Sequence, residues 1–576
     1  MPAIANVDPR RVAEFRRAGY WGDAGLYDYW RLAVISGPER EAVVDSRGHR
    51  ATYAQVDAAA SGLAGFLREA GVLHGDVVTV QLPNWVEFLT VDVACLKLGA
   101  IINPMLPQHR FNEMDYFVDT CGSTAIVMAT QFRSTDYREL AERITTERPQ
   151  VRALVMVEND GVADDRFSTF EEATRHEPLP EYECFGGRGT DVAAVLFTSG
   201  SEARPKGVML THDNVLAGER AFAGDLGIGF GDRMFMPAPV AHATGYLHGV
   251  TMPFMVGGTS VLLDAFGGGA AVAMVNAERA TCGMGATTII RDMFDAAEVC
   301  EPFHDGLRFL CCGGAPVPRD LVERALSLGV RLQSVYGSTE SAPHTLTRPD
   351  DPIDRVIGTD GRAVTGTCVK IVDPRTRVEL PAGSEGEEAS RGPGVFAGYL
   401  GDPELTDKVV DADGWYYSGD LAVSDEDGYV RITGRLKDVI VRGGTNISVT
   451  EVEAILGRHP AIKDAAVVAM PDPRLGECAC AYIVQRPGSA LLDLAAVGTF
   501  FAEQEVAKCK TPERVEIVDS LPMTPAGKVR KVELRERIAA QVALEGPRLV
   551  PPVHCCPAPG EGSPHAGPVL LGTGSR

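Results

Sequence analysis

The chain has 576 residues and a formal net charge of −23, with 45% hydrophobic and 23% charged residues. These proportions are typical of a soluble globular protein, and the length is sufficient for more than one domain. The acidic balance, with no basic stripe to offset it, argues against nucleic acid as a partner because a polyanion would be repelled.

Cysteine spacing and hydropathy indicate the cellular compartment. The 13 cysteines include no C-x-x-C pair, so we expect reduced thiols rather than zinc sites or a disulfide framework. The first 20 residues are rich in arginine and lack the apolar core of a signal peptide. No apolar run approaches the roughly 18 residues that span a bilayer. We therefore expect a cytoplasmic protein without a membrane span; its oligomeric state stays open, with a homodimer among the options.

Residues 52–130 alternate between helical and extended patterns. After a helical repeat come a turn and strand at 75–83, an apolar helix at 85–98 that Gly99 ends, and a further strand at 100–104. This order predicts a largely parallel sheet with helices on both faces. Ligands of such sheets bind beyond the carboxyl ends of the strands.

A glycine- and hydroxyl-rich segment follows the strand predicted at 191–197. It begins at Thr198 and ends with Pro205-Lys206-Gly207. The N–H and O–H groups of such a loop can surround phosphate oxygens, and Lys206 adds a positive charge. The segment differs from the nucleoside triphosphatase loop, because proline precedes the lysine and glycine follows it. By itself it predicts phosphate binding or, alternatively, a polar turn between a strand and a helix.

Three further segments carry candidate functional residues. His242 lies among small residues, and Gly313-Gly314 follows a strand and would let a flat ring approach the backbone. Glu340 ends the run Tyr336-Gly-Ser-Thr-Glu340 and offers the oxygen ligands that hard cations prefer. Each also has an ordinary alternative: a packed histidine, a tight turn and a solvated loop glutamate.

After residue 360 the pattern changes to short runs separated by glycines, which is typical of antiparallel β-structure. We predict a first domain over residues 1–436 and a small α+β domain over 437–545. In the latter, Thr450 and Glu453 fit a capping box at the start of a helix. Residues 546–576, rich in Pro and Gly, are predicted to be a disordered tail.

Five motifs occur in an order that resembles the adenylate-forming superfamily, over about residues 30–540. This superfamily includes acyl- and aryl-CoA ligases, adenylation domains of peptide synthetases and beetle luciferases. The resemblance implies an α/β protein: a large N-terminal domain with mostly parallel sheets flanked by helices plus a β-rich subdomain, followed by a small mobile α+β C-terminal domain. The motifs are Thr198–Gly207, Tyr336–Glu340, Tyr417–Asp420, Gly434–Asp438 and Gly527-Lys528.

The resemblance also implies a two-step reaction. A carboxylate attacks the α-phosphate of ATP, with Mg²⁺ bound, and gives acyl-AMP and pyrophosphate; the thiol of coenzyme A then attacks the acyl carbon and expels AMP. The phosphopantetheine thiol of an acyl carrier protein is an alternative acceptor that the sequence does not separate from coenzyme A. A non-catalytic nucleotide-binding relative would lack Lys528 or Glu340, and both are present.

By resemblance, the nucleotide-binding residues lie on five segments. The phosphate loop would bind the β- and γ-phosphates, the Gly313–Pro316 turn and the Tyr336 segment would hold adenine, and Asp420 would bind the ribose with Arg435 nearby. The residues are Thr198, Ser199, Gly200, Ser201, Lys206, Gly313, Gly314, Ala315, Pro316, Tyr336, Gly337, Asp420 and Arg435.

The resemblance assigns the chemistry to four residues. Thr339 would bond the α-phosphate, Glu340 would ligate Mg²⁺, and Lys528 would meet the α-phosphate and the acid. His242 would close the thiol tunnel in the first step. Two further assignments concern the second step and the hinge: pantetheine would pass the backbone of Gly443 and Gly444, and Lys437 lies at the hinge position.

The family's acid pocket lies between the His242 segment, residues 283–287 and residues 337–345. In this chain those segments are mainly small or apolar. None offers an evident acidic partner for the ammonium group of an amino acid. We therefore expect a bulky apolar acid: alicyclic, aromatic or medium-chain.

Overall fold

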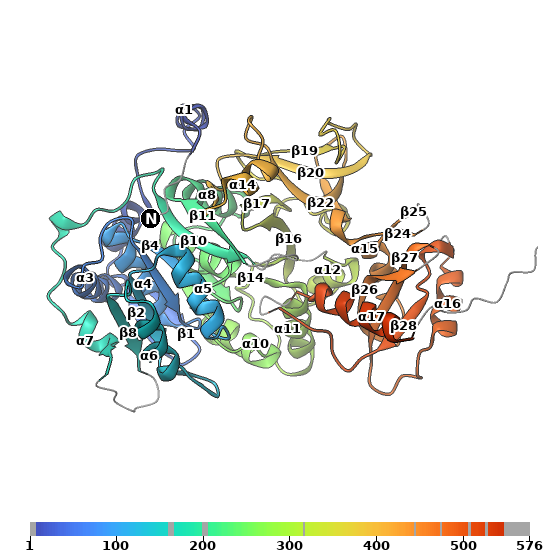
Figure 1. Cartoon of the computed structure of the whole chain (residues 1–576), viewed down its shortest axis with the longest axis horizontal. Coiled ribbons are helices and arrows are strands. Elements are labelled where there is room, and N and C mark those ends of the chain that lie inside the picture. The colour runs from blue at the N-terminus through green and yellow to red at the C-terminus, as the bar shows by residue number, and fades with distance from the viewer. Residues whose placement is uncertain are drawn as a thin grey trace, which may run out of the picture.

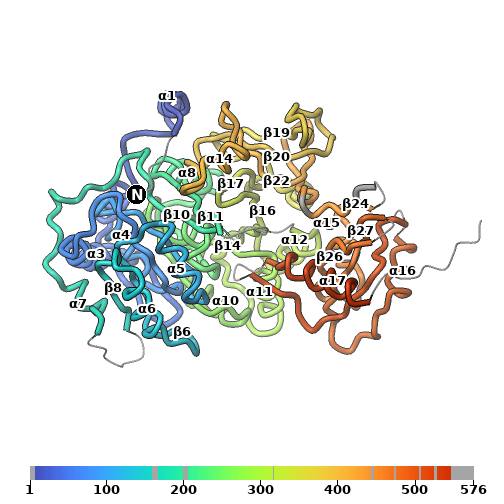
Figure 2. Tube along the Cα trace, in the orientation of Figure 1, coloured from blue at the N-terminus to red at the C-terminus, as the bar shows by residue number. Residues whose placement is uncertain are grey.

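The computed structural model describes residues 7–158, 166–198, 205–314, 317–442, 445–472, 475–504, 508–524 and 528–545. Figure 1 shows a large body formed by the blue to yellow part of the chain and a smaller orange to red body beside it. The Cα trace in Figure 2 follows the same path from one body to the other. Among the described residues, no helix combines the length and apolar character needed to cross a membrane.

An eight-stranded sheet forms the first layer of the large body, in the order β21-β11-β10-β4-β3-β5-β8-β9. Its pairings from β10 through β4, β3, β5, β8 and β9 are parallel. The buried Val- and Ile-rich strands β3 and β5 fit a sheet covered on both faces. The strands are β3 Val77–Gln81, β4 Ile101–Pro104, β5 Ala125–Ala129, β8 Ala153–Val157, β9 Ser168–Thr169, β10 Val192–Thr198, β11 Lys206–Thr211 and β21 Gly398–Tyr399.

The helices that accompany this sheet follow the predicted alternation. The helix predicted at 85–98 is α4, and its C-cap Gly99 has φ 65° in the left-handed region, as expected for a glycine that ends a helix. The helices are α1 Pro9–Arg17, α2 Leu26–Ser36, α3 Tyr53–Glu69, α4 Val86–Leu98, α5 Phe111–Cys121, α6 Arg138–Glu147 and α7 Phe170–Thr174; a short hairpin, β6 Gln131–Phe132 and β7 Thr135–Asp136, and a 3₁₀ turn, η1 Glu181–Glu183, complete this region.

The segment after β10 is a hairpin connection. β10 pairs antiparallel with β11, and Thr198 lies opposite Lys206. The alternative of a turn between a strand and a helix is therefore wrong, because a further strand intervenes before α8 (His212–Leu226). Lys206 is consequently the first residue of β11 and lies opposite Thr198, the last residue of β10.

A nine-stranded sheet forms the second layer, in the order β18-β17-β16-β15-β14-β12-β13-β1-β2. Its central strands from β1 to β16 are parallel and its edges are antiparallel. The strands are β1 Glu41–Asp45, β2 Arg50–Thr52, β12 Arg233–Met236, β13 Thr259–Leu262, β14 Cys282–Ala286, β15 Phe309–Gly313, β16 Arg331–Ser338, β17 Ser341–Leu346 and β18 Arg362–Ala363.

Helices of the second layer include a π-helical segment, η2, that directly follows the His242 turn. π-Helical segments are rare and frequently occur at functional sites. The remaining helical elements here are η2 Thr244–Thr251, α9 Met252–Val256, α10 Gly268–Ala277, α11 Thr287–Val299, α12 Arg319–Ser327, α13 Ile353–Gly358 and α14 Pro403–Val409.

The glycine-punctuated region after residue 360 is an antiparallel four-stranded sheet, as predicted. The large parallel layers and this β-rich part confirm the expected fold class. The four strands are β19 Cys368–Val372, β20 Glu385–Arg391, β22 Tyr416–Ser424 and β23 Val430–Arg435.

The small C-terminal body has a sheet of its own, to which β28 adds a parallel strand. The predicted division at residue 437 is consistent with the change of sheet after β23. The elements are η3 Leu436–Asp438, β24 Val439–Arg442, β25 Thr445–Ser448, α15 Val449–Leu456, β26 Ile462–Asp472, β27 Gly476–Gln485, α16 Leu494–Glu503, η4 Lys508–Lys510, β28 Arg514–Ile517 and α17 Lys531–Glu545.

The capping box predicted in this body is wrong. Helix α15 has Ser448 as its N-cap, whose hydroxyl accepts a hydrogen bond from the Glu451 N–H at 3.3 Å. Glu453 instead binds the Lys531 ammonium at 2.8 Å and accepts a hydrogen bond from Val467 N–H. Glu453 is therefore engaged by Lys531 of α17 and by β26 rather than by the start of the helix.

The conformation of the turn that holds His242 depends on Gly245, the second residue of η2. A Cβ at Gly245 would lie 2.1 Å from the Pro239 carbonyl oxygen. We predict that Gly245→Ala lowers the free energy of unfolding by about 1–3 kcal/mol, because backbone atoms must move apart. Urea denaturation would measure the change.

Gly224→Ala is the matched control, since a Cβ at that position in α8 meets nothing within 4 Å. Alanine is the better helix former, so we expect a stabilisation of about 0.5–1 kcal/mol. Equal effects of the two substitutions would contradict the steric argument.

Candidate active site

The candidate site lies where the two bodies meet. A Cβ built on Gly314, directly after β15, would lie 2.8 Å from Cε and 3.5 Å from Nζ of Lys528. Gly314 has φ 83°, a conformation that also favours glycine. The predicted turn at Gly313-Gly314 therefore leaves space for Lys528 of the C-terminal body. It would also let a flat ring approach the backbone, as predicted from the sequence.

Lys528 is positioned by a turn just before α17. Its N–H donates to Thr524 Oγ1 at 3.0 Å, and the Thr524 N–H donates to the Lys528 carbonyl at 2.6 Å. An ion pair also joins the two bodies: Arg291 of α11 lies 3.6 Å from Asp464 of β26. The lysine thus reaches the large body from a fixed backbone position.

Three residues that the resemblance assigns to the site affect the pKa of Lys528. Burial is the main cause that lowers the pKa of Lys528; Arg435 lowers it further, while Asp420 and Glu340 raise it. Three predicted site residues from different strands and turns are therefore close enough to act on this ammonium. Two carboxylates and one competing cation surround it.

His242 lies in the large body, on the turn that precedes η2. Its N–H donates to the Pro239 carbonyl and its own carbonyl accepts from Tyr246 N–H, both at 2.9 Å, so the residue sits on a tight turn ahead of η2. Burial lowers its pKa to about 4, and the positive charge of Lys528 contributes in the same direction. The imidazole is consequently neutral near pH 7.

The predicted adenine and ribose residues form one hydrogen-bonded group. The Tyr336 hydroxyl lies 2.9 Å from Asp420 Oδ2 and 3.2 Å from Glu388 Oε2. Arg435 Nε lies 2.8 Å from the other Asp420 oxygen. Glu388, fully buried on β20, also binds His344 Nδ1 at 3.0 Å. Tyr336 and Asp420 are held by this group before any ligand binds.

A second group joins the phosphate loop to Glu340. The Tyr399 hydroxyl donates to Glu340 Oε1 at 2.7 Å, and Lys206 Nζ lies 5.3 Å from the centre of the Tyr399 ring. No cluster of three or more His, Cys, Asp or Glu suited to a metal occurs among the residues that the structure describes. A single carboxylate nevertheless fits Mg²⁺, which proteins usually hold with one or two carboxylates together with substrate phosphates.

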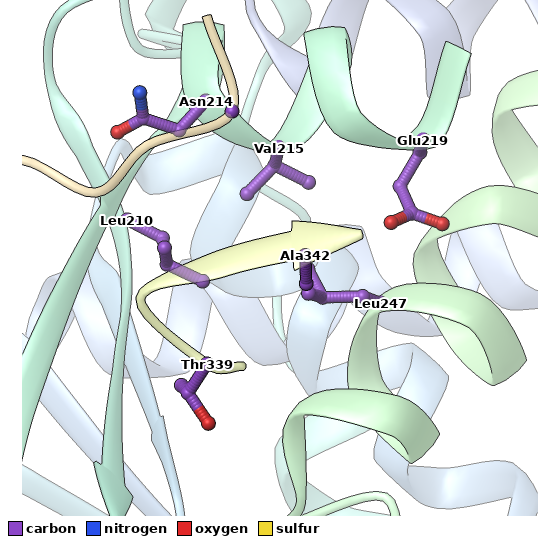
Figure 3. A pocket seen from close by; sticks show the side chains of 8 residues that line it. Leu210, Asn214, Val215, Glu219, Leu247, Thr339 and Ala342 are labelled. Carbon is purple, nitrogen blue, oxygen red and sulfur yellow. The ribbon is translucent and has the colours of Figure 1, made fainter. Parts of the chain in front are cut away.

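The remaining predicted residues divide into two sets. Thr339, in the β16–β17 turn, lines a cavity under α8 (Figure 3), and Gly337 packs against Pro343. Several predicted residues lie outside the described part of the chain, as does the side chain of Lys437: Ser199, Gly200, Ser201, Ala315, Pro316, Gly443 and Gly444.

Sequence reasoning missed three residues that shape this region. Glu388 and Tyr399 orient predicted residues, and Glu219 of α8 places a buried carboxylate beside the cavity. Glu219 lies outside the three segments from which the small, apolar acid pocket was predicted, so that prediction did not consider it. α8 also carries other charged residues, such as Asp213 and Arg220, so nothing in the sequence signals that Glu219 is buried.

Comparisons with known proteins identify the family of the chain. Residues 32–400 match the family model described as AMP-binding enzyme, and residues 451–528 match the AMP-binding enzyme C-terminal domain. The chain is 44% identical over 545 residues to a medium-chain fatty-acid–CoA ligase of Escherichia coli, covering 95% of this chain and 96% of the relative. It is 34% identical to a feruloyl-CoA synthase of an Amycolatopsis species, covering 85% and 94%.

Solved structures show the same architecture. ATP-bound MatB from Rhodopseudomonas palustris superposes with a TM-score of 0.81 at 27% identity, covering 90% of this chain and 99% of that one. The fold is that of the adenylate-forming enzymes. With both family models matched, the chain belongs to the AMP-binding enzyme family and, within it, to the AMP-forming acyl-CoA synthetases.

The electrostatic contact between Lys528 and His242 can be measured directly. We predict that His242 does not titrate above about pH 5 in the intact protein, as burial and Lys528 together lower its pKa to about 4. Lys528→Ala should raise this pKa, because a positive charge that disfavours the protonated imidazole is removed. Proton–carbon NMR of histidine-labelled protein would follow the resonance that disappears in His242→Gln.

Lys531→Ala serves as the control. Its ammonium binds Glu453 in the C-terminal body, so the substitution should leave the titration of His242 unchanged. A histidine that titrates near pH 6.5 in the intact protein would show that Lys528 and burial do not act on it.

Proposed function

We propose that the enzyme activates a medium-chain apolar carboxylic acid to acyl-AMP and transfers the acyl group to coenzyme A. The observation that carries the residue assignments is the position of Lys528, which rests against Gly314 and is influenced by Asp420 and Glu340. In-line attack on phosphorus spreads negative charge over the equatorial oxygens, and a positioned ammonium stabilises that charge. This arrangement suits the first half-reaction.

The nucleotide would bind to groups that are already oriented. Asp420, held by Tyr336 and Arg435, would accept hydrogen bonds from the ribose hydroxyls, and the Tyr336 ring would stack on adenine beside Gly313 and Gly314. Because these side chains are fixed in advance, little conformational entropy is lost on binding. Thr198 and Lys206 would hold the β- and γ-phosphates together with the loop between them.

Glu340 is the residue that would hold Mg²⁺, with Tyr399 donating to one of its oxygens. Once bound, the metal would neutralise phosphate charge. Thr339 would donate to the α-phosphate, and Lys528 would bridge that phosphate and the acid carboxylate. The carboxylate oxygen bonds to phosphorus as the bond to pyrophosphate breaks, and the electron pair leaves with pyrophosphate.

For the second step we propose that the C-terminal body turns about Lys437. Lys528 would then leave Gly314, and Gly443 and Gly444 would line the path of the pantetheine arm. His242, whose pKa is lowered by burial and by the charge of Lys528 in the present arrangement, would then move aside. The thiol sulfur would attack the acyl carbon, its proton would pass to solvent, and AMP would leave.

The acid class rests on the cavity lining and on the relatives. Leu210, Val215, Leu247 and Ala342 give the cavity mainly aliphatic walls. A relative at 44% identity is named for medium-chain fatty acids, and one at 34% for ferulate. A medium-chain acid is therefore the first candidate, and an aromatic or alicyclic acid is the second.

A panel of acids tests this function. Pyrophosphate release with ATP and Mg²⁺ should be at least about tenfold faster, as kcat/KM, with hexanoate to decanoate than with acetate, since each buried methylene contributes to discrimination. Acyl-AMP should then react with coenzyme A. Preference for acetate or an amino acid would overturn the assignment, and acyl transfer to a phosphopantetheinylated carrier protein but not to coenzyme A would favour the alternative acceptor.

The role of Lys528 has its own test. Lys528→Ala should lower the rate of acyl-AMP formation by about 100-fold or more, the effect of losing a preorganised charge-stabilising group. Thiol transfer from supplied acyl-AMP should be largely spared. Single-turnover assays of the two half-reactions would separate these effects.

Arg530→Ala is the matched control in the same segment. Its guanidinium pairs with Glu533 on α17, and both side chains are more than half exposed. We expect both half-reactions to proceed at the rates of the unsubstituted enzyme. Equal loss of the two steps in Lys528→Ala would contradict a role confined to adenylation.

A further inference from the structure

A cavity between α8, η2 and the β16–β17 turn extends away from the candidate reaction centre. Thr339, which belongs to that centre, lies at one end, and Figure 3 shows Glu219 at the other, with Ala342 and Leu247 between them. The rest of the lining is mainly aliphatic. The cavity has a volume of about 10 Å³, which is roughly the space of one water molecule. A chain that entered it from the Thr339 end would have to displace that water and would then meet Glu219.

The far end of this cavity is charged. Glu219 is 1% exposed and His248 of η2 is 3% exposed, and His248 Nδ1 lies 2.9 Å from Glu219 Oε2. The imidazole also stacks on Phe222 of α8, with ring centres 4.1 Å apart. The buried contact between Glu219 and His248 thus joins α8 to η2.

One oxygen of this carboxylate is unsatisfied. Glu219 Oε1 is buried and has no hydrogen-bond partner among the residues that the structure describes. Buried polar atoms are normally hydrogen-bonded, and burying a charged group without a partner is costly. An occupant of the cavity therefore meets an acceptor at this end rather than an apolar wall.

The backbone also narrows the cavity here. A Cβ at Gly218, the residue before Glu219, would lie 2.6 Å from the Ala342 carbonyl oxygen, so α8 and β17 are in close contact. The carboxylate cannot be displaced outward without separating these elements. An alkyl end that reached it would have to bury a charged oxygen against carbon.

We propose that the Glu219–His248 pair forms the far wall of the acyl pocket and sets the longest alkyl chain that the enzyme activates. This inference rests on the proposed function and adds the residues that limit its substrate. A chain that ends short of Glu219 leaves Oε1 to a water molecule, which can donate the missing hydrogen bond. A longer chain excludes that water and is rejected.

Two variants test the wall by different means. Glu219→Ala removes the charge and opens space, whereas the double variant Glu219→Leu with His248→Phe replaces the pair by apolar side chains of similar size. Replacing both partners of a buried hydrogen bond by apolar groups of similar shape can be nearly neutral or stabilising, so the second variant keeps the test valid if the first does not fold. Each is assayed by kcat/KM for straight-chain acids from butanoate to tetradecanoate.

In the unsubstituted enzyme, kcat/KM should rise with chain length and then fall beyond a limit. In both variants the ratio of kcat/KM for the first acid past that limit to kcat/KM for the best acid should rise by about tenfold or more. Glu219→Ala should move the optimum itself to a longer acid.

Asp92→Asn is the matched control. Asp92 of α4 is a second buried carboxylate that contacts η2, through the Tyr246 hydroxyl at 3.3 Å, and its Oδ2 also lacks a hydrogen-bond partner within the described residues. It does not line the cavity, so its substitution should leave the chain-length profile unchanged.

The outcomes separate this inference from the proposed function. If the unsubstituted enzyme activates no acid of the panel, the proposed function fails. If it is active but both folded variants keep the original profile, or Asp92→Asn shifts it equally, the wall assignment is wrong. If neither variant folds, the pair is purely structural and the proposal is likewise overturned.

Discussion

The contact between Lys528 and Gly314 is the constraint on which the arrangement of the site depends. A lysine from the C-terminal body occupies the space that any side chain at position 314 would need. The glycine is therefore required both by its backbone conformation and by the approach of Lys528. The approach of the two bodies also brings the charge of Lys528 within range of His242, Asp420 and Glu340.

Buried carboxylates organise the rest of the centre. Glu388 receives hydrogen bonds from Tyr336 and His344, and Asp420 is bound by Tyr336 and Arg435. Such groups are costly to bury unless they are satisfied, and a satisfied network fixes a single arrangement. The same physical rule explains why the unpartnered oxygen of Glu219 stands out among the carboxylates near the cavity.

The π-helical segment η2 connects the two halves of the proposed chemistry. It directly follows the turn of His242, whose pKa the charge of Lys528 lowers, while His248 within it holds Glu219 at the cavity. Tyr246, between them, is tied to α4 through Asp92. A single short element thus places a residue at the proposed thiol gate and a residue at the end of the acyl pocket.

The sequence by itself determined the local elements and the class of chemistry. Spacing and residue type are informative where a feature depends on near neighbours in the chain. Such features are the apolar repeat that ends at Gly99, the antiparallel strands after residue 360 and the motif around Tyr336 and Glu340. The roles assigned to site residues came from the resemblance, and they remain proposals for this chain.

Only the tertiary structure decided which partners those elements acquire. Glu453 fitted a helix cap by spacing but binds Lys531, 78 positions further along the chain, and the phosphate segment joins antiparallel strands although its composition also suited a strand-to-helix turn. Glu219 and His248 are separated by 29 positions and carry no shared local signal. The burial and pairing of a polar side chain depend on which distant elements pack against it, and that information is absent from any short stretch of sequence.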